Sequence, residues 1–189
     1  MNKTFFAIFL TLVLSGCVET IVVGTVATGA YVASDSNVTI IDKDKDSKIK
    51  LIVEKSFKIE EEPKEYKYIN VKVYNGRVML TGYVKDEKYK KIAVNKSNAI
   101  LGDGSTIDEI LVVKNGSISS VNDSMISAQI SLKLRFAKDI NTSHYRYNVV
   151  DGVVYILGES NDPSEIARTT KILSEVRGVE KVITYIKLV

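Results

Sequence analysis

The chain carries one thiol and one imidazole, at Cys17 and His144, and these two side chains limit the chemistry available to it. A thiolate is a nucleophile and a metal ligand. With a single cysteine, no disulfide can form within the chain and a thiolate-rich metal site is excluded. With a single histidine and no cysteine cluster, a zinc site is not expected. These counts weigh against most hydrolytic and metal-dependent reactions, and we expect no cofactor.

Other chemistry-bearing residues form no catalytic group in the sequence. The run Glu60–Glu62 beside Pro63 is typical of a solvated helix end. His144 adjoins a run of Tyr and Asn, which predicts a surface or partly buried strand residue, with pH sensing as the alternative. Gly102–Ser105 lacks the following helix and lysine of a phosphate-binding loop. We therefore expect a binding module rather than an enzyme.

The amino terminus has the pattern of a secretory signal. Lys3 precedes the apolar segment Phe5–Leu14, which is too short to cross a bilayer core of about 30 Å. The tetrapeptide Leu14–Cys17 resembles the lipobox of bacterial lipoproteins, in which small residues precede an acylated cysteine. The alternative is a plain secretory signal that happens to contain a cysteine. Because the only cysteine stands at the lipobox position, we assign residues 1–16 to a lipoprotein signal peptide.

The lipobox resemblance implies that Cys17 is lipidated and anchors the mature chain in a membrane. In enteric bacteria, an Asp directly after the lipidated cysteine resembles a signal for retention in the inner membrane. This chain has Val18 at that position, so we expect the protein in the outer membrane, facing the periplasm. Residues 17–41 comprise this cysteine and a tether rich in Val, Ala, Thr and Gly. We interpret the tether as a spacer; contact with the lipid surface or with the protein's own body is the alternative.

The composition is that of a globular protein, with 45% hydrophobic and 26% charged residues. The formal charge of +3 falls to +2 when Lys3 leaves with the signal peptide. This excess is too small for a dedicated nucleic-acid binder, so we expect no nucleic-acid partner.

An internal repeat organises the rest of the chain. Asn75-Gly76 and Asp151-Gly152 are hairpin-turn dipeptides between β-rich runs, and they lie 76 residues apart. Further identities at this offset are Val73/Val149, Val78/Val154, Gly82/Gly158, Asp86/Asp162, Gly102/Gly178, Ile107/Ile183, Ile110/Ile186 and Val113/Val189. We conclude that residues 42–115 and 120–189 are tandem copies of one unit.

Each unit is predicted to have the order αββαβ. In the first unit, Ile49, Ile52, Val53, Ser56 and Phe57 form one helical stripe. The expected elements are helices 44–58 and 87–100 with strands 66–74, 77–84 and 107–113, then helices 122–138 and 163–177 with strands 144–150, 153–159 and 179–188. The predicted fold is α+β, with a three-stranded mixed sheet and two helices on one face in each unit. Since each unit of about 70 residues is marginally stable alone, we expect the two to pack together.

The motif [ND]-G-x-V-x-[LI]-x-G, followed by a capped helix and a Val/Ile strand, resembles the BON domain. It is carried by Asn75, Gly76, Val78, Leu80 and Gly82, and again by Asp151, Gly152, Val154, Ile156 and Gly158. A lipobox, a tether and two such domains resemble the DolP family of outer-membrane lipoproteins. This resemblance implies binding of anionic phospholipid and support of envelope integrity.

The helix that opens the second unit has two apolar strips. Ile126, Ile130, Leu134 and Ala137 form a core stripe, and Met125, Leu132 and Phe136 form a second strip about 100° away. A helix with two apolar faces needs two burial partners. The second strip either packs against the first unit or contacts lipid acyl chains.

The resemblance places the family's lipid-contacting surface on this helix. Asn122-Asp123-Ser124 matches the family's motif there, with Met125 in place of an aromatic residue. Lys133, Arg135 and Lys138 stand nearby to meet phosphate headgroups. We therefore predict a lipid site formed by Met125, Leu132, Lys133, Arg135, Phe136 and Lys138. The alternative function is an adaptor that recruits an outer-membrane assembly machine or a cell-wall partner through the exposed sheet face.

Replacing Cys17 with Ala tests the anchor. Because Cys17 is the sole thiol, Cys17→Ala should abolish acylation and release the protein from membranes, or leave an uncleaved precursor. Membrane fractionation and mass spectrometry of the amino terminus measure both effects. A variant that stays in the outer membrane with the same mature amino terminus would contradict the lipobox assignment.

Overall fold

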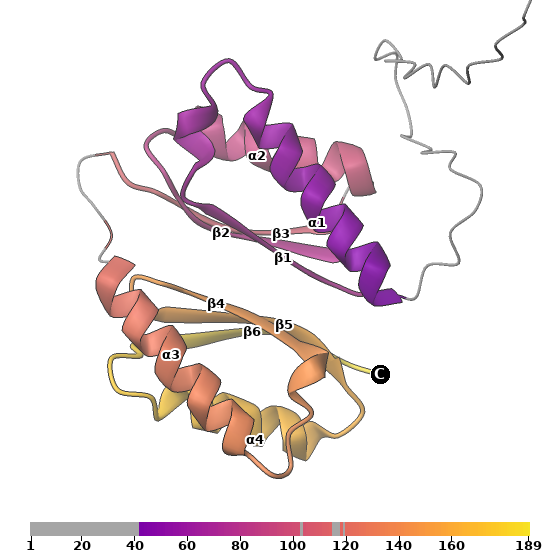
Figure 1. Ribbon diagram of the computed structural model, residues 1–189, viewed down its shortest axis with the longest axis vertical. Helices are drawn as coiled ribbons and strands as arrows, with labels where there is room; N and C mark the ends of the chain where they lie inside the picture. Colours follow the sequence, from indigo (N-terminus) through magenta and orange to yellow (C-terminus); the bar gives the residue numbers. More distant parts are fainter. Residues whose placement is uncertain (1–41, 103, 115–117, 119) are drawn as a thin grey trace, which may run out of the picture.

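The computed structural model describes residues 42–102, 104–114, 118 and 120–189, which form the two domains of Figure 1. The elements of the first domain, in chain order, are α1 (Asp42–Lys58), the 3-10 helix η1 (Pro63–Tyr66), β1 (Ile69–Tyr74), β2 (Arg77–Val84), α2 (Glu87–Leu101) and β3 (Thr106–Val112).

The second domain repeats this order. Its elements are α3 (Ser120–Phe136), the 3-10 helix η2 (Thr142–His144), β4 (Tyr145–Val150), β5 (Val153–Ser160), α4 (Pro163–Ser174) and β6 (Lys181–Leu188).

Each domain has a three-stranded mixed sheet whose middle strand is the second strand of the hairpin. β2 pairs antiparallel with β1 and parallel with β3, and β5 pairs in the same way with β4 and β6. The two helices of each domain cover the outer face of its sheet (Figure 1). The predicted α+β fold, with two tandem αββαβ domains, is confirmed.

The two hairpins turn at the dipeptides that mark the repeat. Asn75 and Gly76 have φ angles of 49° and 73°, and Asp151 and Gly152 have 51° and 74°. Two successive residues with positive φ are what a two-residue hairpin turn of type I′ requires, and Asn, Asp and Gly adopt this conformation at the lowest cost. The turns therefore fix the register of both hairpins.

Some element ends differ from the predicted bounds. β1 begins at Ile69 rather than at residue 66, because Pro63–Tyr66 form a 3-10 turn before the strand. α4 ends at Ser174 rather than at residue 177. Its last turn tightens, since the Val176 N–H donates to the Leu173 carbonyl oxygen at 3.2 Å.

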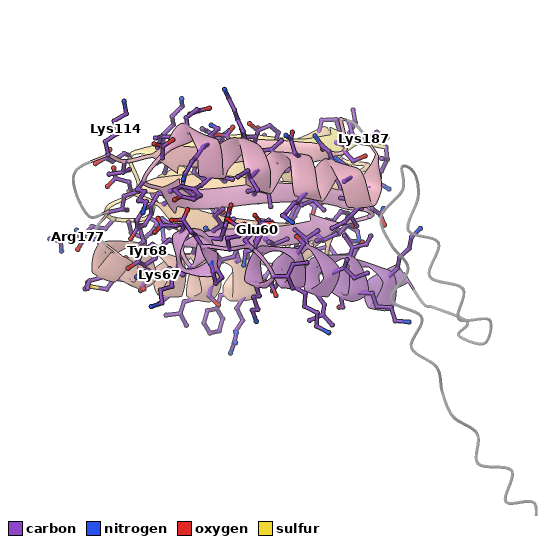
Figure 2. All side chains as sticks on the ribbon, turned by 90° about the horizontal axis from the view of Figure 1, so that it is seen from above. Glu60, Lys67, Tyr68, Lys114, Arg177 and Lys187 are labelled. Carbon is purple, nitrogen blue, oxygen red and sulfur yellow. The ribbon has the colours of Figure 1, made fainter. Side chains whose placement is uncertain are left out.

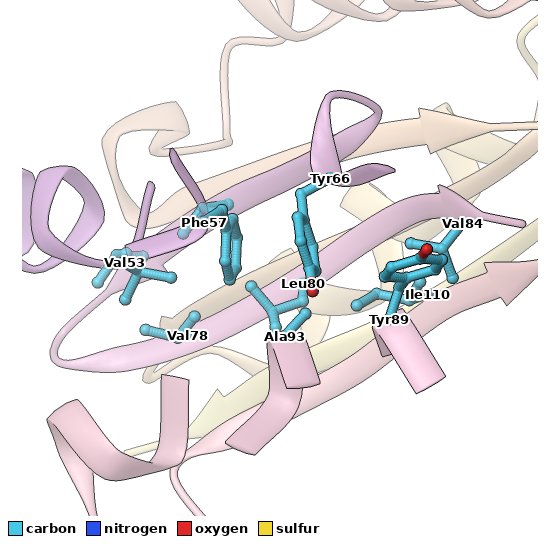
Figure 3. Close-up of a cluster of buried hydrophobic side chains, with 11 residues drawn as sticks. Val53, Phe57, Tyr66, Val78, Leu80, Val84, Tyr89, Ala93 and Ile110 are labelled. Carbon is cyan, nitrogen blue, oxygen red and sulfur yellow. The ribbon is translucent and has the colours of Figure 1, made fainter. Parts of the chain in front are cut away.

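Each domain has its own core between its helices and its sheet. Figure 3 shows the first core, where Val53 and Phe57 of α1 pack against Leu80 and Ala93. Ile52 was expected in the same helical stripe, and this is wrong: 47% of its surface is exposed. Adjacent helix positions point about 100° apart, so burying Val53 turns Ile52 toward solvent. The second core is centred on Ile126, Ile130, Val154, Ile156 and Leu173.

A third cluster joins the two domains through the inner faces of their sheets. Met79 of β2 packs with Val150, Tyr155 and Leu157 of the second domain, and all four are buried. Met79 and Tyr155 are equivalent positions of the repeat, as are Ile107 and Ile183, which border the cluster. The two domains therefore bury the same face against each other, as expected for tandem units that are marginal alone.

Hydrogen bonds across this interface show that the domains are related by an approximate two-fold axis. The Tyr185 hydroxyl donates to the carboxylate of Glu109, and these two residues occupy equivalent positions of the repeat. Equivalent side chains meet in this way only near a two-fold axis. Asn148 Nδ2 also donates to Thr81 Oγ1 at 2.9 Å. Because each sheet covers the other, the exposed sheet face expected for an adaptor is absent from the described residues.

Replacing Gly82 or Gly158 with Val should destabilise the protein by about 1–3 kcal/mol each. A Cβ at Gly82 would lie 2.0 Å from the Tyr68 carbonyl oxygen, and one at Gly158 would lie 2.2 Å from the His144 carbonyl oxygen. Both contacts are with the backbone residue just before the neighbouring strand, β1 or β4, which cannot move aside without disturbing the hairpin. Thermal and denaturant unfolding measure the loss, and unchanged stability of both variants would contradict it.

Gly76→Ala is the matched control for steric contact. Nothing lies within 4 Å of a Cβ at Gly76, but its φ of 73° is positive. Only the backbone conformation then opposes the substitution, at about 1–2 kcal/mol. Gly158 is the reverse case, because its φ lies outside the left-handed region and the steric contact acts alone.

Candidate functional site

Helix α3 presents an apolar face to solvent. Its core side is formed by Ile126, Ile130 and Leu134, which are at most 5% exposed. Met125, Leu132 and Phe136 are 60%, 56% and 75% exposed. Val121 and Ala128 continue this row at helical spacing and are also exposed. We call Val121, Met125, Ala128, Leu132 and Phe136 the apolar strip of α3.

Of the two alternatives for the second strip, the structure contradicts packing against the first domain. The domains meet through the inner faces of their sheets, whereas α3 and α4 cover the outer face of the second sheet (Figure 1). A side chain that points away from the sheet on α3 therefore points away from the first domain as well. The strip lies on the outside of the molecule.

Two aspartates fix the alignment of α3 with its counterpart α1. The carboxylate of Asp46 accepts hydrogen bonds from the Asn75 and Gly76 N–H groups at 2.8 and 2.9 Å. The carboxylate of Asp123 accepts from the Asp151 and Gly152 N–H groups, both at 2.9 Å. Each opening helix is thus bound to the hairpin turn of its own domain by the same contact, 77 residues apart.

This alignment shows how the exposed faces of the two helices differ. Lys48 and Lys55 of α1 correspond to Met125 and Leu132 of α3. The core positions stay apolar in both copies, as in the pair Val53 and Ile130. At these two positions α1 is charged and α3 is apolar, whereas Ala128 and Phe136 correspond to Leu51 and Ile59, which are also apolar and exposed. Packing does not require a charged residue in one helix and an apolar residue in the other, because neither pair of positions belongs to a core.

A shallow apolar groove lies beside the carboxyl-terminal half of the strip. It has a volume of about 400 Å³ and is lined by Leu132, Lys133, Phe136, Ala137 and Ile172, so it runs between α3 and α4. The wall side chains are mostly apolar. A flexible hydrocarbon chain is the kind of ligand that such a groove suits.

The three basic residues of the predicted site lie near the strip in different settings. Arg135 and Lys138 are exposed, and Lys138 follows the end of α3. Lys133 Nζ donates to the Glu175 carbonyl oxygen at 3.2 Å, just beyond the end of α4. Lys133 is therefore held toward α4 by a carbonyl that favours a cation.

The remaining candidate residues are not gathered at α3. Cys17 lies outside the described residues. His144 ends η2, where a ring nitrogen is 3.0 Å from Asn141 Nδ2. The acidic run does not end a helix, since α1 stops at Lys58. Instead, Glu60 pairs with Lys96 and the Tyr89 hydroxyl donates to Glu62, which connects this turn to α2. The pKa of Glu62 is lowered by the hydrogen bonds from Tyr89 and Lys88.

Two general features of the described part of the chain bear on membrane and metal binding. No helix there is long and apolar enough to cross a bilayer. No group of three or more His, Cys, Asp or Glu side chains there is placed to hold a metal ion.

Residues 45–114 and residues 122–189 each match the BON domain. The chain belongs to the BON-domain family. Residues 1–17 match the prokaryotic membrane lipoprotein lipid attachment site, which ends at Cys17. The BON domains thus follow a lipid anchor.

Relatives match most of this BON-domain chain. It is 29% identical over 181 residues to outer membrane lipoprotein DolP of Haemophilus influenzae, covering 94% of the chain and 91% of the relative. It is 34% identical over 132 residues to an uncharacterized protein in the gshII 5' region of Anaplasma centrale, covering 64% and 81%. The attachment site and the similarity to DolP identify a lipid-anchored outer-membrane protein.

Among solved structures, the chain is similar to the C-terminal domain of CdsD, a structural protein of the type III secretion system of Chlamydia trachomatis. The identity is 15%, the match covers 79% of the chain and 68% of the other, and the TM-score is 0.31. This value is too low to support an argument about arrangement or function.

The role of Asp46 and Asp123 could not be recognised in the sequence. Asp123 stands in the segment Asn122-Asp123-Ser124, which the family resemblance associates with lipid contact, yet its carboxylate is buried on the hairpin turn. The sequence signal for this role is an aspartate at the same place in both opening helices. A search for repeats at the strand offset of 76 misses it, because the two helices align at an offset of 77.

Asp123→Asn should destabilise the second BON domain by about 2–4 kcal/mol, because hydrogen bonds to a charged acceptor each contribute about 1.5–3 kcal/mol. An amide has one oxygen, so its nitrogen would face one of the two turn N–H groups. Asp46→Asn should have a similar effect in the first domain. Chemical denaturation measures the loss, and a free energy of unfolding that neither substitution lowers would contradict the turn-binding role.

Proposed function

We propose that this lipoprotein binds anionic phospholipid at the periplasmic side of the outer membrane through α3, and thereby supports envelope integrity. The observation that carries the proposal is the apolar strip of α3. Exposed apolar patches on soluble domains are typical of contact with lipid or with another protein. The family resemblance and the lipid anchor favour lipid.

The divergence between the two copies supports the same function. If the exposed face of an opening helix only met water, charged residues would serve as well as they do at Lys48 and Lys55 of α1. Methionine and leucine at the equivalent places make the molecule less soluble. Lipid contact gives these side chains a burial partner without altering the core of the domain.

The expected affinity of α3 for a membrane is modest. Fully burying a Met, Leu or Phe side chain contributes about 1.5–3 kcal/mol, and an interfacial helix buries such residues only in part. Each cation near an anionic surface adds about 1 kcal/mol, which Arg135 and Lys138 can supply. We infer that lipidated Cys17 holds the protein in the membrane, whereas α3 orients the domains against it.

Met125→Ser combined with Phe136→Ser should weaken attachment of the soluble fragment 42–189 to anionic vesicles. Stability should change little, since both side chains are more than half exposed. Co-sedimentation and thermal melts on the same samples measure both effects. The matched control is Leu51→Ser with Ile59→Ser at exposed apolar positions of the first domain, which should leave vesicle binding unchanged.

Charge reversal and restoration of an aromatic residue test the same site in opposite directions. Arg135→Glu with Lys138→Glu should reduce binding to anionic vesicles, most evidently at low salt, where screening is weakest. Met125→Trp should strengthen binding, because Trp is a better interfacial anchor. Equal binding to neutral and anionic vesicles, or unchanged binding by the Met125→Ser/Phe136→Ser variant, would contradict the proposal.

A further inference from the structure

Three basic side chains from three elements meet in a groove at the boundary between the domains. Lys50 of α1, Lys72 of β1 and Arg146 of β4 line it, and its volume is about 240 Å³. The remaining lining residues are Asp46, Ser47, Val71 and Val73. The first domain supplies both lysines and the second supplies the arginine, so the complete groove exists only when the sheets are packed together.

The cations in this groove are only partly neutralised. Among the described residues, no carboxylate lies within ion-pair distance of Lys72 or Arg146. Arg146 donates to the Ser143 and Tyr145 carbonyl oxygens at 3.0 and 2.9 Å, which are neutral acceptors. Lys50 and Glu54 form an exposed pair at 3.7 Å, and such pairs contribute little.

The other nearby carboxylates have donors of their own. Asp46 accepts both N–H groups of the Asn75-Gly76 turn, and Glu159 accepts from Asn75 Nδ2 at 2.7 Å. These contacts hold the two carboxylates on the hairpin turn. The positive charge of Lys72 and Arg146 therefore has no anionic partner of its own.

The charged form of Lys72 is destabilised in this groove. Its pKa is lowered by burial and by the neighbouring charges of Lys50 and Arg146, an effect that Glu54 only partly opposes. A lowered pKa means that the folded protein disfavours the charged form of this lysine. An anion between the three cations would remove the repulsion. Clusters that a fold tolerates at such a cost are typical of binding sites.

The approximate two-fold axis provides an internal comparison. The equivalent groove of the second domain, with a volume of about 450 Å³, places Ser127, Asn148 and Asn70 where the first has Lys50, Lys72 and Arg146. At these three positions the cations are thus replaced by neutral residues, although Lys67 lines this groove from another position. Asn148 bonds to Thr81 across the interface. Both domains have the same fold and pack through the same sheet faces, with or without cations at these three positions. Packing therefore does not require the cations.

We propose that the groove of Lys50, Lys72 and Arg146 binds a phosphate group, carried as a phosphate monoester or diester. A phosphate has enough oxygens and charge to meet two ammonium groups and a guanidinium that approach from different elements. The site is separate from the apolar strip, so it goes beyond the lipid contact of α3. In the view of Figure 2, α1, which supplies Lys50, and α3 lie along the same side of the molecule, so a lipid headgroup and a soluble phosphate ester are both sources to test.

Titration of the fragment 42–189, which contains both complete cores, tests the site. Inorganic phosphate or glycerol phosphate should cause saturable NMR shifts at Lys72 and Arg146, and chloride at equal ionic strength should not. Lys72→Asn and Arg146→Asn introduce the residues found at the equivalent positions of the second groove. Each should weaken binding about tenfold or more, as expected for loss of a charge-assisted hydrogen bond. The control Lys181→Asn removes an exposed lysine of β6 and should leave binding unchanged.

Thermal melts separate binding from folding. Phosphate should raise the melting temperature of the parent fragment, because a ligand that binds only the folded state stabilises it. Without phosphate, Lys72→Asn should melt no lower than the parent, since it removes like-charge repulsion, and phosphate should no longer raise its melting temperature. A Lys72→Asn fragment that melts lower and still responds fully to phosphate would overturn the proposal.

Vesicles that contain phosphatidylglycerol identify the source of the phosphate. Weaker vesicle binding by Lys72→Asn supports a lipid headgroup, and unchanged vesicle binding with lost glycerol phosphate binding supports a soluble ester. The Met125→Ser/Phe136→Ser variant should keep its phosphate shifts, so failure of the α3 site is seen separately. The proposal is overturned if phosphate causes no saturable shift and neither neutral substitution alters vesicle binding.

Discussion

The packing of one sheet against the other determines which surfaces of this protein are available. Met79, Val150, Tyr155 and Leu157 bury the inner faces of both sheets, so all four helices are on the outside. Each domain has only about 70 residues, and a domain of that size gains stability from a second buried face. Once the sheets are committed to each other, the outer sides of the helices and the grooves along the boundary are left for function. The apolar strip of α3 and the cationic groove occur at these two kinds of place.

The duplication separates what the fold needs from what it does not. Both copies keep the hairpin turn, the glycine beneath the neighbouring strand, and the aspartate that binds the turn N–H groups. The copies differ where these constraints do not act. Lys48 and Lys55 correspond to Met125 and Leu132, and Lys50 and Lys72 correspond to Ser127 and Asn148. At these positions the second copy is apolar or neutral, whereas the first copy is charged. Since the two scaffolds are alike, packing does not account for these contrasts, which is why we propose functions for both surfaces.

Most of the fold could be predicted from local patterns, because the elements depend on local physics. The Asn-Gly and Asp-Gly turns set both hairpins, and the stripes of the two opening helices, apart from Ile52, identified the side that meets the sheet. The exposure of the apolar strip of α3 could not be predicted in the same way, since it depends on which face of the second domain meets the first. Periodicity shows that a helix has two apolar sides but not what covers the second one. The role of Asp123 was missed for a related reason: its partners, the N–H groups of Asp151 and Gly152, are nearly 30 residues away in the chain.

The two surfaces differ in how they depend on the association of the domains. The strip of α3 lies within one domain, so it needs only the second core to hold its helix in place. The cationic groove takes Lys72 from one sheet and Arg146 from the other, so it is lost whenever the sheets separate. An anion bound there would favour the packed state by as much as it prefers the complete groove to its separated halves. Repulsion between these cations opposes domain association in the absence of ligand, and a phosphate bound as proposed would reverse that effect. The proposed phosphate site would therefore couple its occupancy to the packing of the two sheets, whereas the strip of α3 is independent of that packing.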